Sequence, residues 1–247
     1  MDRIRFDLPD YRLSATGDSR EAAAPRRATR LWLRALLFLI KLLIAAVLPF
    51  VVLIRGAVFL YGHYGLNVWL ALAVGAGMTA LVLMFYLRVL RRRVFGRRPG
   101  ARGGVRLGAG LVGMALLVYC GYTLVYISAA NAKTTETHRE FTSLHPLLRL
   151  AVGTVLLADR DLLITDVARD REDYGRMGLR PARRSLHYPQ ADGYVHAVDL
   201  RTAGRGEVRN WLLAVYFRSM GFHTLRHVGS GDHLHISIPT HDRPNAI

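Results

Sequence analysis

The sequence predicts an α+β domain that follows three transmembrane helices. The chain has 247 residues and is 51% hydrophobic, but most of its apolar residues lie in long runs between positions 31 and 130. The remaining sequence shows the shorter periodicities of helices and strands in a soluble domain. We therefore expect a membrane region and a small folded domain in one chain.

Three apolar runs are long enough to cross a bilayer, which takes about 20 residues of helix. They are Ala35 to Ile54, Gly65 to Leu87 and Leu107 to Ala129. The first contains Lys41, whose ammonium group can extend to the lipid headgroups. No small-residue cleavage site follows this run closely, so we expect a membrane anchor and not a cleaved signal peptide.

The charge distribution predicts the orientation in the membrane. The net charge is +16, and residues 1 to 106 carry 18 Lys and Arg against 5 acidic residues. Eight arginines and no acidic residue lie between Arg88 and Arg106. Because such loops stay in the cytoplasm, we expect the tail 1–34 and this loop inside, and everything after Ala130 outside. The positive charge therefore reflects topology, and we expect no nucleic-acid partner.

The soluble part is predicted to begin with a polar linker, 131–140, and to continue as one domain, 141–247. The chain has a single cysteine, Cys120 in the membrane region, so no intrachain disulfide can form. Helical spacing and alternation predict its elements in this order: a helix over Pro146 to Leu157, strands over Leu162 to Val167 and Tyr194 to Leu200, a helix ending near Gly221, and strands over His223 to Val228 and His233 to Ile238, joined by the turn Gly229 to Asp232.

Histidines and one carboxylate in this domain indicate a metal site. Seven of the ten histidines fall between positions 187 and 241. In a strand, alternation places His233 and His235 on one face, with Leu234 on the other. Asp199 lies among apolar strand residues, where a buried carboxylate needs a cation or strong hydrogen bonds. Two imidazoles and one carboxylate would leave a fourth tetrahedral position for water, as in catalytic zinc sites.

Three sequence fragments resemble a known superfamily. They are Ser185-Leu186-His187-Tyr188, Ala197-Val198-Asp199-Leu200 and His233-Leu234-His235. Their order is similar to the Ser-x-His, Ala-Val-Asp and His-x-His pattern of the D-alanyl-D-alanine carboxypeptidases, the L-alanyl-D-glutamate endopeptidases (peptidase M15-like) and the hedgehog amino-terminal domain. The resemblance covers roughly residues 162 to 239 and none of the membrane region. It implies a Zn²⁺ ion held by His187, Asp199 and His235.

The resemblance also implies roles for four other residues. Asp232 stands where the peptidases carry the acidic general base, and His233 would stabilise the developing oxyanion or orient the substrate. Arg169 and Ser185 would contact the substrate, Arg169 through its planar guanidinium. Asp232 is also a common turn residue, His233 a common strand-surface residue, and Arg169 can pair with a neighbouring acid instead.

One departure from the family pattern leaves an alternative open. Eleven residues separate His187 from Asp199, a longer spacer than the family usually has. An inserted turn can accommodate them at little entropic cost. His196 could replace His187 as ligand, but it stands three residues before Asp199, so strand alternation would place the two on opposite faces.

The function expected from these features is that of a membrane-anchored zinc peptidase acting on peptidoglycan stem peptides. The resemblance implies a bacterial cytoplasmic membrane, with the domain on its outer side and the lipid bilayer as a second partner. A non-catalytic, zinc-containing binding or sensing module is the alternative, because the hedgehog domain belongs to the same superfamily. A purely structural hydrogen-bonded cluster is a third interpretation. Transport is disfavoured, since the spans lack the buried ionisable residues of a transport path.

Overall fold

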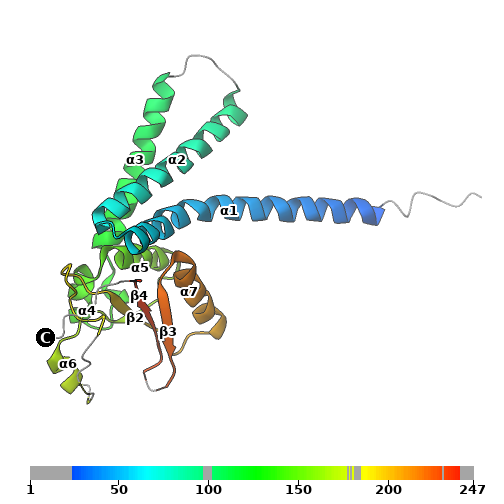
Figure 1. Cartoon of the computed structure of the whole chain (residues 1–247). Helices are drawn as coiled ribbons and strands as arrows, with labels where there is room; N and C mark the ends of the chain where they lie inside the picture. Colours follow the sequence, from blue (N-terminus) through cyan, green and yellow to red (C-terminus); the bar gives the residue numbers. More distant parts are fainter. Residues whose placement is uncertain are drawn as a thin grey trace, which may run out of the picture. The chain divides into compact units, whose positions relative to one another are not determined.

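The computed structural model of the chain describes residues 24–96, 102–176, 178, 180, 185–229 and 231–239. Three long helices come first, and a mixed domain of helices and a small sheet follows (Figure 1). The chain divides into two compact units with the boundary after Ala46, inside the first helix. All contacts described below lie within the second unit.

The three predicted membrane helices are confirmed as helices of spanning length and apolar composition. They are α1 (Ala24–Tyr64), α2 (Val68–Phe95) and α3 (Arg102–Val125). Helix α1 begins before Ala35 and continues past Ile54, so the apolar run alone underestimated it. The amino-terminal residues 1–23 and part of the arginine loop, residues 97–101, lie outside the described residues.

The stretch 131–140, expected to be a linker, is folded against the domain. It contains the end of the 3₁₀ turn η2 (Ala129–Asn131) and helix α4 (Thr135–Glu140), which the turn η3 (Phe141–Ser143) follows. The buried Asn131 amide donates hydrogen bonds to the carbonyl oxygens of Arg160, at 2.7 Å, and Leu162, at 2.9 Å. Thr134 caps α4 through its hydroxyl. These side-chain bonds order a segment whose polar composition favoured a loop.

Four antiparallel strands form the sheet, in the order β1-β2-β4-β3. The strands are shorter than the predicted apolar runs: β1 (Ile164–Asp166), β2 (Ala197–Arg201), β3 (His223–His227) and β4 (His233–Ser237). Val195 precedes β2 and makes isolated bridges to Leu144 and Pro189 instead of joining the ladder. A short helix that the sequence analysis did not predict, α6 (Arg171–Arg176), follows β1.

Helices α5 (Pro146–Ala158) and α7 (Glu207–Met220) supply most of the helical part of the core. Helix α7 ends at Gly221, as predicted, because this residue takes a φ of 98° that other residues rarely adopt. One face of the sheet packs into this core through alternate residues of β2 and β4, which are fully or almost fully buried: Val198, Leu200, Leu234 and Ile236. The opposite face is left to Asp199, Arg201, His233 and His235.

Helix α3 packs directly against α5 of the domain. At Gly153 of α5, a Cβ atom would lie 2.8 Å from the Thr123 Cβ and 2.9 Å from the Thr123 carbonyl oxygen. The buried Arg149 guanidinium donates to the carbonyl oxygen of Leu124 at 2.9 Å, near the end of α3 where helix carbonyls lack partners. The third apolar helix is therefore part of the domain's packing and not a free tether.

We expect Gly153→Ala to destabilise the folded chain. Its methyl group would meet the Thr123 backbone, and such overpacking costs about 1–3 kcal/mol, more than the roughly 1 kcal/mol that alanine gains over glycine in a helix. Thermal unfolding in detergent micelles measures the change. Gly121→Ala in α3 is the matched control, because its Cβ would meet nothing within 4 Å. Equal melting temperatures for the two variants would contradict this packing.

Candidate metal centre

The structure brings His187, Asp199 and His235 together at the open face of the sheet. One ligand-type atom from each lies within 4.8 Å of the other two. Asp199 in β2 and His235 in β4 are directly opposite each other in the antiparallel register. Residues opposite each other on one face are close neighbours in such a ladder. The sheet register alone therefore fixes two members of the group.

His187 reaches the group from the irregular segment that precedes β2. A neighbouring backbone bond, from His196 N to Leu186 O at 2.9 Å, ties this segment to the start of β2. His187 Nε2 lies 3.4 Å from Asp199 Oδ1 and 3.3 Å from His235 Nδ1. His235 Nδ1 in turn donates to Asp199 Oδ1 at 2.8 Å. The eleven-residue spacer is accommodated by a turn that leaves His187 beside Asp199.

The hydrogen bonds of His187 leave the correct nitrogen available for a metal ion. Its Nδ1 lies 2.7 Å from the carbonyl oxygen of Val167. A carbonyl only accepts, so Nδ1 carries the proton and Nε2 keeps its lone pair. Metal-bound histidines commonly donate their second nitrogen to a carbonyl or carboxylate in this way. The donor set and this tautomer fit zinc, provided His235 Nδ1 releases its proton on binding.

Asp199 is held as a carboxylate by its neighbours. Burial alone raises the pKa of this group, but the two neighbouring imidazoles, of which His235 donates to Oδ1, outweigh burial and hold the pKa well below its ordinary value. The Arg169 guanidinium donates to Asp199 Oδ2 at 2.7 Å. Oδ2 is thereby occupied, while Oδ1 faces the two imidazoles. This arrangement presents one carboxylate oxygen to a metal ion.

Arg169 and Ser185, predicted to bind substrate, both make bonds inside the protein. Arg169 also donates to Asp166 Oδ2 at 2.5 Å and lies over the Tyr174 ring. The buried Ser185 hydroxyl accepts from the backbone N–H of His187 at 3.2 Å and from the Tyr174 hydroxyl at 2.9 Å. Both side chains therefore position metal-site residues in this structure.

Asp232 does not lie in the group. Its carboxylate accepts hydrogen bonds from Thr202 Oγ1 at 2.5 Å and from Arg226 Nη2 at 3.2 Å, and these bonds lower its pKa. Arg226 also pairs with Glu207 of α7, which lies on the helix-covered side of the sheet. Asp232 thus faces the opposite side of the sheet from His235, as strand alternation places residues three positions apart.

His233, in contrast, lies on the face of the group. Its Nε2 is 3.6 Å from Asp199 Oδ2, and its Nδ1 hydrogen-bonds with the carbonyl oxygen of Gly231. The ring stacks on His227 of the neighbouring strand with 4.8 Å between centroids. The ring is partly exposed, so a substrate at the open face can reach it.

A second group of metal-ligating residue types was not predicted. It combines His145, Asp192 and His196. His196 Nε2 lies 2.9 Å from Asp192 Oδ2, so the structure places this histidine beside Asp192 and not beside Asp199. Nothing in the sequence pointed to this group: His145 stands before Pro146 and caps α5, a local role that carries no metal signal.

Hydrogen bonding distinguishes the second group from the first. His145 Nδ1 accepts from the backbone N–H of Leu147 at 3.3 Å, so its proton resides on Nε2, the nitrogen that faces Asp192. His196 Nδ1 is buried without a partner. Neither ring has the Nδ1 acceptor that His187 has in Val167. The first group is therefore the better candidate metal centre.

Comparisons of the chain with protein-family models, with curated proteins and with solved structures find no match. The class of protein is therefore defined by fold and site. It combines three apolar helices of spanning length with an α+β domain that carries a candidate metal centre.

We expect the purified full chain to bind roughly one zinc ion, the stoichiometry of a single tetrahedral site. His235→Gln should reduce zinc well below this level, because it removes a ligand from the group. His196→Gln is the matched control and should retain the metal. Elemental analysis by mass spectrometry after dialysis gives both values. Loss of zinc in the His196 variant alone would exchange the roles of the two groups.

We expect Arg169→Gln to weaken zinc binding by about 10- to 100-fold, the usual effect of removing a residue that orients a ligand. Asp199 would lose the guanidinium that occupies Oδ2. Competition with a chromophoric chelator measures the dissociation constant. Arg201→Gln changes an exposed arginine on the same sheet face and should leave the affinity unchanged. An equal effect of both substitutions would point to a general loss of positive charge.

Proposed function

We propose that this protein is a membrane-anchored, zinc-dependent peptidase that hydrolyses peptide bonds of peptidoglycan stem peptides. The observation that carries the proposal is the group of His187, Asp199 and His235, which opens on the uncovered face of the sheet. The resemblance of the same residues to the D-alanyl-D-alanine and L-alanyl-D-glutamate peptidases supports the substrate class. The arginine-rich loop supports an extracytoplasmic domain.

When bound, zinc would polarise the scissile carbonyl and activate a water molecule for attack on it. His187, Asp199 and His235 would hold it, leaving its open side towards solvent because the His235 side chain is 23% exposed. Arg169 keeps Asp199 oriented through Oδ2. The three ligand residues are thus held in place before a metal ion binds, and the site is open to solvent on one side.

His233 is suited to stabilise negative charge that develops at the carbonyl oxygen. Its Nδ1 hydrogen-bonds with Gly231 O, which fixes the ring, and its Nε2 lies on the face of the metal group, 3.6 Å from Asp199 Oδ2. A side chain held in this way contributes to catalysis because it needs no reorganisation during the reaction. We therefore keep His233 as the residue that stabilises the oxyanion or orients the substrate.

Asp232 would need to leave Arg226 and Thr202 to serve as the general base. A base is most effective when its pKa is close to the working pH, and the bonds of Asp232 lower its pKa instead. This observation favours the second candidate function, a non-catalytic zinc-containing module for binding or sensing in the cell envelope. The two functions share the metal site and differ in turnover.

A substrate carboxylate would meet Arg201 more readily than Arg169. Arg201 lies on the open face, two residues after Asp199 and opposite His233 in the register. It is exposed, and no acidic partner pairs with it among the described residues. An arginine in this position can bind a carboxylate through two parallel hydrogen bonds. We propose that Arg201 takes the substrate role first assigned to Arg169.

We expect the zinc-loaded full chain to cleave purified stem peptides. If Asp232 leaves Arg226 and Thr202 when substrate binds and then serves as the general base, Asp232→Asn lowers kcat by about 10²–10⁴-fold. Mass spectrometry of the peptide products measures turnover. Glu207→Gln is the matched control, because Glu207 shares Arg226 with Asp232 and its loss should leave kcat near the wild-type value. Arg201→Gln should mainly raise KM.

A zinc-loaded wild type that releases no product from any stem peptide would instead establish the binding module. Turnover that survives in Asp232→Asn would remove Asp232 from the mechanism. In that case His233→Gln decides whether a histidine carries the proton. Zinc content is measured for every variant, so that loss of metal is separated from loss of chemistry.

A further inference from the structure

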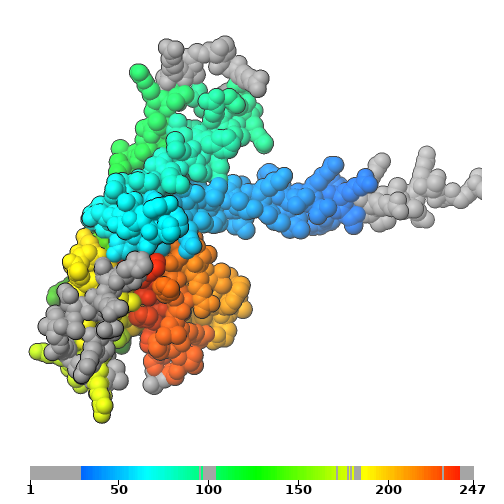
Figure 2. Space-filling model, viewed as in Figure 1, coloured from blue at the N-terminus to red at the C-terminus, as the bar shows by residue number. Residues whose placement is uncertain are grey.

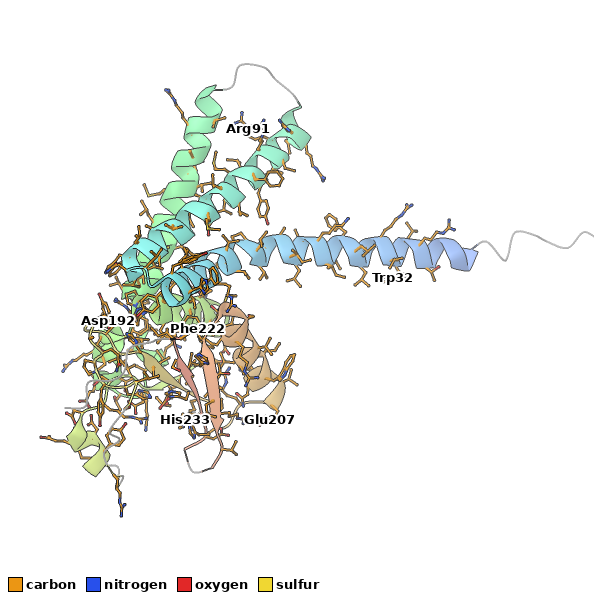
Figure 3. All side chains as sticks on the ribbon, viewed as in Figure 1. Trp32, Arg91, Asp192, Glu207, Phe222 and His233 are labelled. Carbon is orange, nitrogen blue, oxygen red and sulfur yellow. The ribbon has the colours of Figure 1, made fainter. Side chains whose placement is uncertain are left out.

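A cavity lies at the ends of α1 and α2, where the α1–α2 turn meets the segment before β2. Its volume is about 460 Å³. The cyan end of this helix pair and the yellow segment that contains Asp192 adjoin in Figure 2. In Figure 3, Asp192 lies towards the helix ends and His233 towards the far end of the sheet. Residues with polar or aromatic side chains in the lining include Tyr61, Asn67, Trp69, Asp192 and Tyr194.

Asp192 gives this cavity a negative charge. Its side chain is 28% exposed, whereas the two histidines behind it, His145 and His196, are fully buried. Burial, with contributions from His196 and Arg149, lowers the pKa of His145 to about 2, so this ring is neutral. His196 and the backbone N–H of Tyr194 donate to the carboxylate, and no Lys or Arg pairs with it among the described residues.

The cavity also lies at the ends of two helices that are long and apolar enough to cross a bilayer. The apolar part of α1 runs to Tyr64, and that of α2 begins at Val68. Tyr64 and Trp69 are 63% and 50% exposed, and such aromatic residues are enriched at the headgroup level of membrane proteins. The neighbouring Phe59 and Leu70 are also exposed and would lie against acyl chains. A membrane boundary at these helix ends would bring lipid headgroups to the cavity that Asp192 lines.

We propose that this cavity binds the primary ammonium headgroup of a phospholipid, with Asp192 as its acceptor. A primary ammonium group has three N–H donors for a carboxylate, and the aromatic rings of Tyr61 and Trp69 in the lining suit a cation. A phosphoglycerol headgroup carries no positive charge and would meet the Asp192 carboxylate unfavourably. The site is separate from the metal centre, and the inference does not rest on the proposed peptidase function.

Native mass spectrometry of the full chain, released from micelles that contain equal amounts of phosphatidylethanolamine and phosphatidylglycerol, tests the proposal. We expect the wild type to retain phosphatidylethanolamine about tenfold over phosphatidylglycerol, as one charge-assisted hydrogen bond would give. Asp192→Asn should remove most of this preference. Glu136→Gln, which changes an exposed acid on α4, should keep it. Equal retention of both lipids by the wild type, or an unchanged preference in Asp192→Asn, would overturn the site.

A second variant covers the case in which Asp192→Asn fails to fold, since it weakens the bonds from His196 and from the Tyr194 backbone N–H. Trp69→Ala removes an exposed ring from the cavity wall without touching the domain core. We expect it to lower the phosphatidylethanolamine preference, and an unchanged preference would count against the proposal. His235→Gln should leave lipid retention intact while zinc is lost, so failure of the metal centre is distinguishable from failure of the lipid site.

Discussion

The carboxylate of Asp199 is the group on which the site depends. It lies in the middle of a buried strand, where an ionised carboxylate without partners would be strongly destabilising. Two imidazoles face Oδ1 and one guanidinium binds Oδ2, so every neighbour either stabilises the charge or can share it with a metal ion. Asp166 accepts a hydrogen bond from Arg169, and Tyr174 donates one to Ser185. These bonds hold in place the two residues that contact Asp199 and His187. A metal ion would complete this arrangement by replacing the proton on His235.

Strand alternation is a local rule, so the faces of β2 and β4 were predictable, whereas the grouping of Asp199 with His235 came from the resemblance and the register comes from the folded sheet. Apolar neighbours on β2 and the leucine between two histidines on β4 fix which side chains share a face. The position of Asp232 was not predictable in the same way. Its direction depends on Arg226 of β3 and Thr202 after β2, two partners that only the folded sheet brings together. The resemblance gave Asp232 a role from its place in the sequence, and its side-chain direction comes only from the folded sheet.

Arg169 illustrates a second limit of sequence reasoning. Arg169 carries a charge that suits a substrate carboxylate equally well, and only the distance to Asp199 shows which carboxylate it binds in this structure. The short strands and the folded 131–140 segment have a similar cause, because side-chain bonds such as those of Asn131 lie far apart in sequence. The three membrane helices, in contrast, follow directly from apolar length. Their contact with the domain through Gly153 does not.

X-ray absorption spectroscopy of the zinc-loaded full chain tests the central claim most directly. We expect a first shell of light atoms only, with two imidazole ligands at roughly 2.0–2.1 Å and oxygen ligands at about 2.0–2.2 Å. In His235→Gln one imidazole contribution should disappear, and in His196→Gln both should remain. A shell with sulfur, which would implicate Cys120, or two unchanged imidazoles in His235→Gln, would contradict the assignment of the metal to His187, Asp199 and His235.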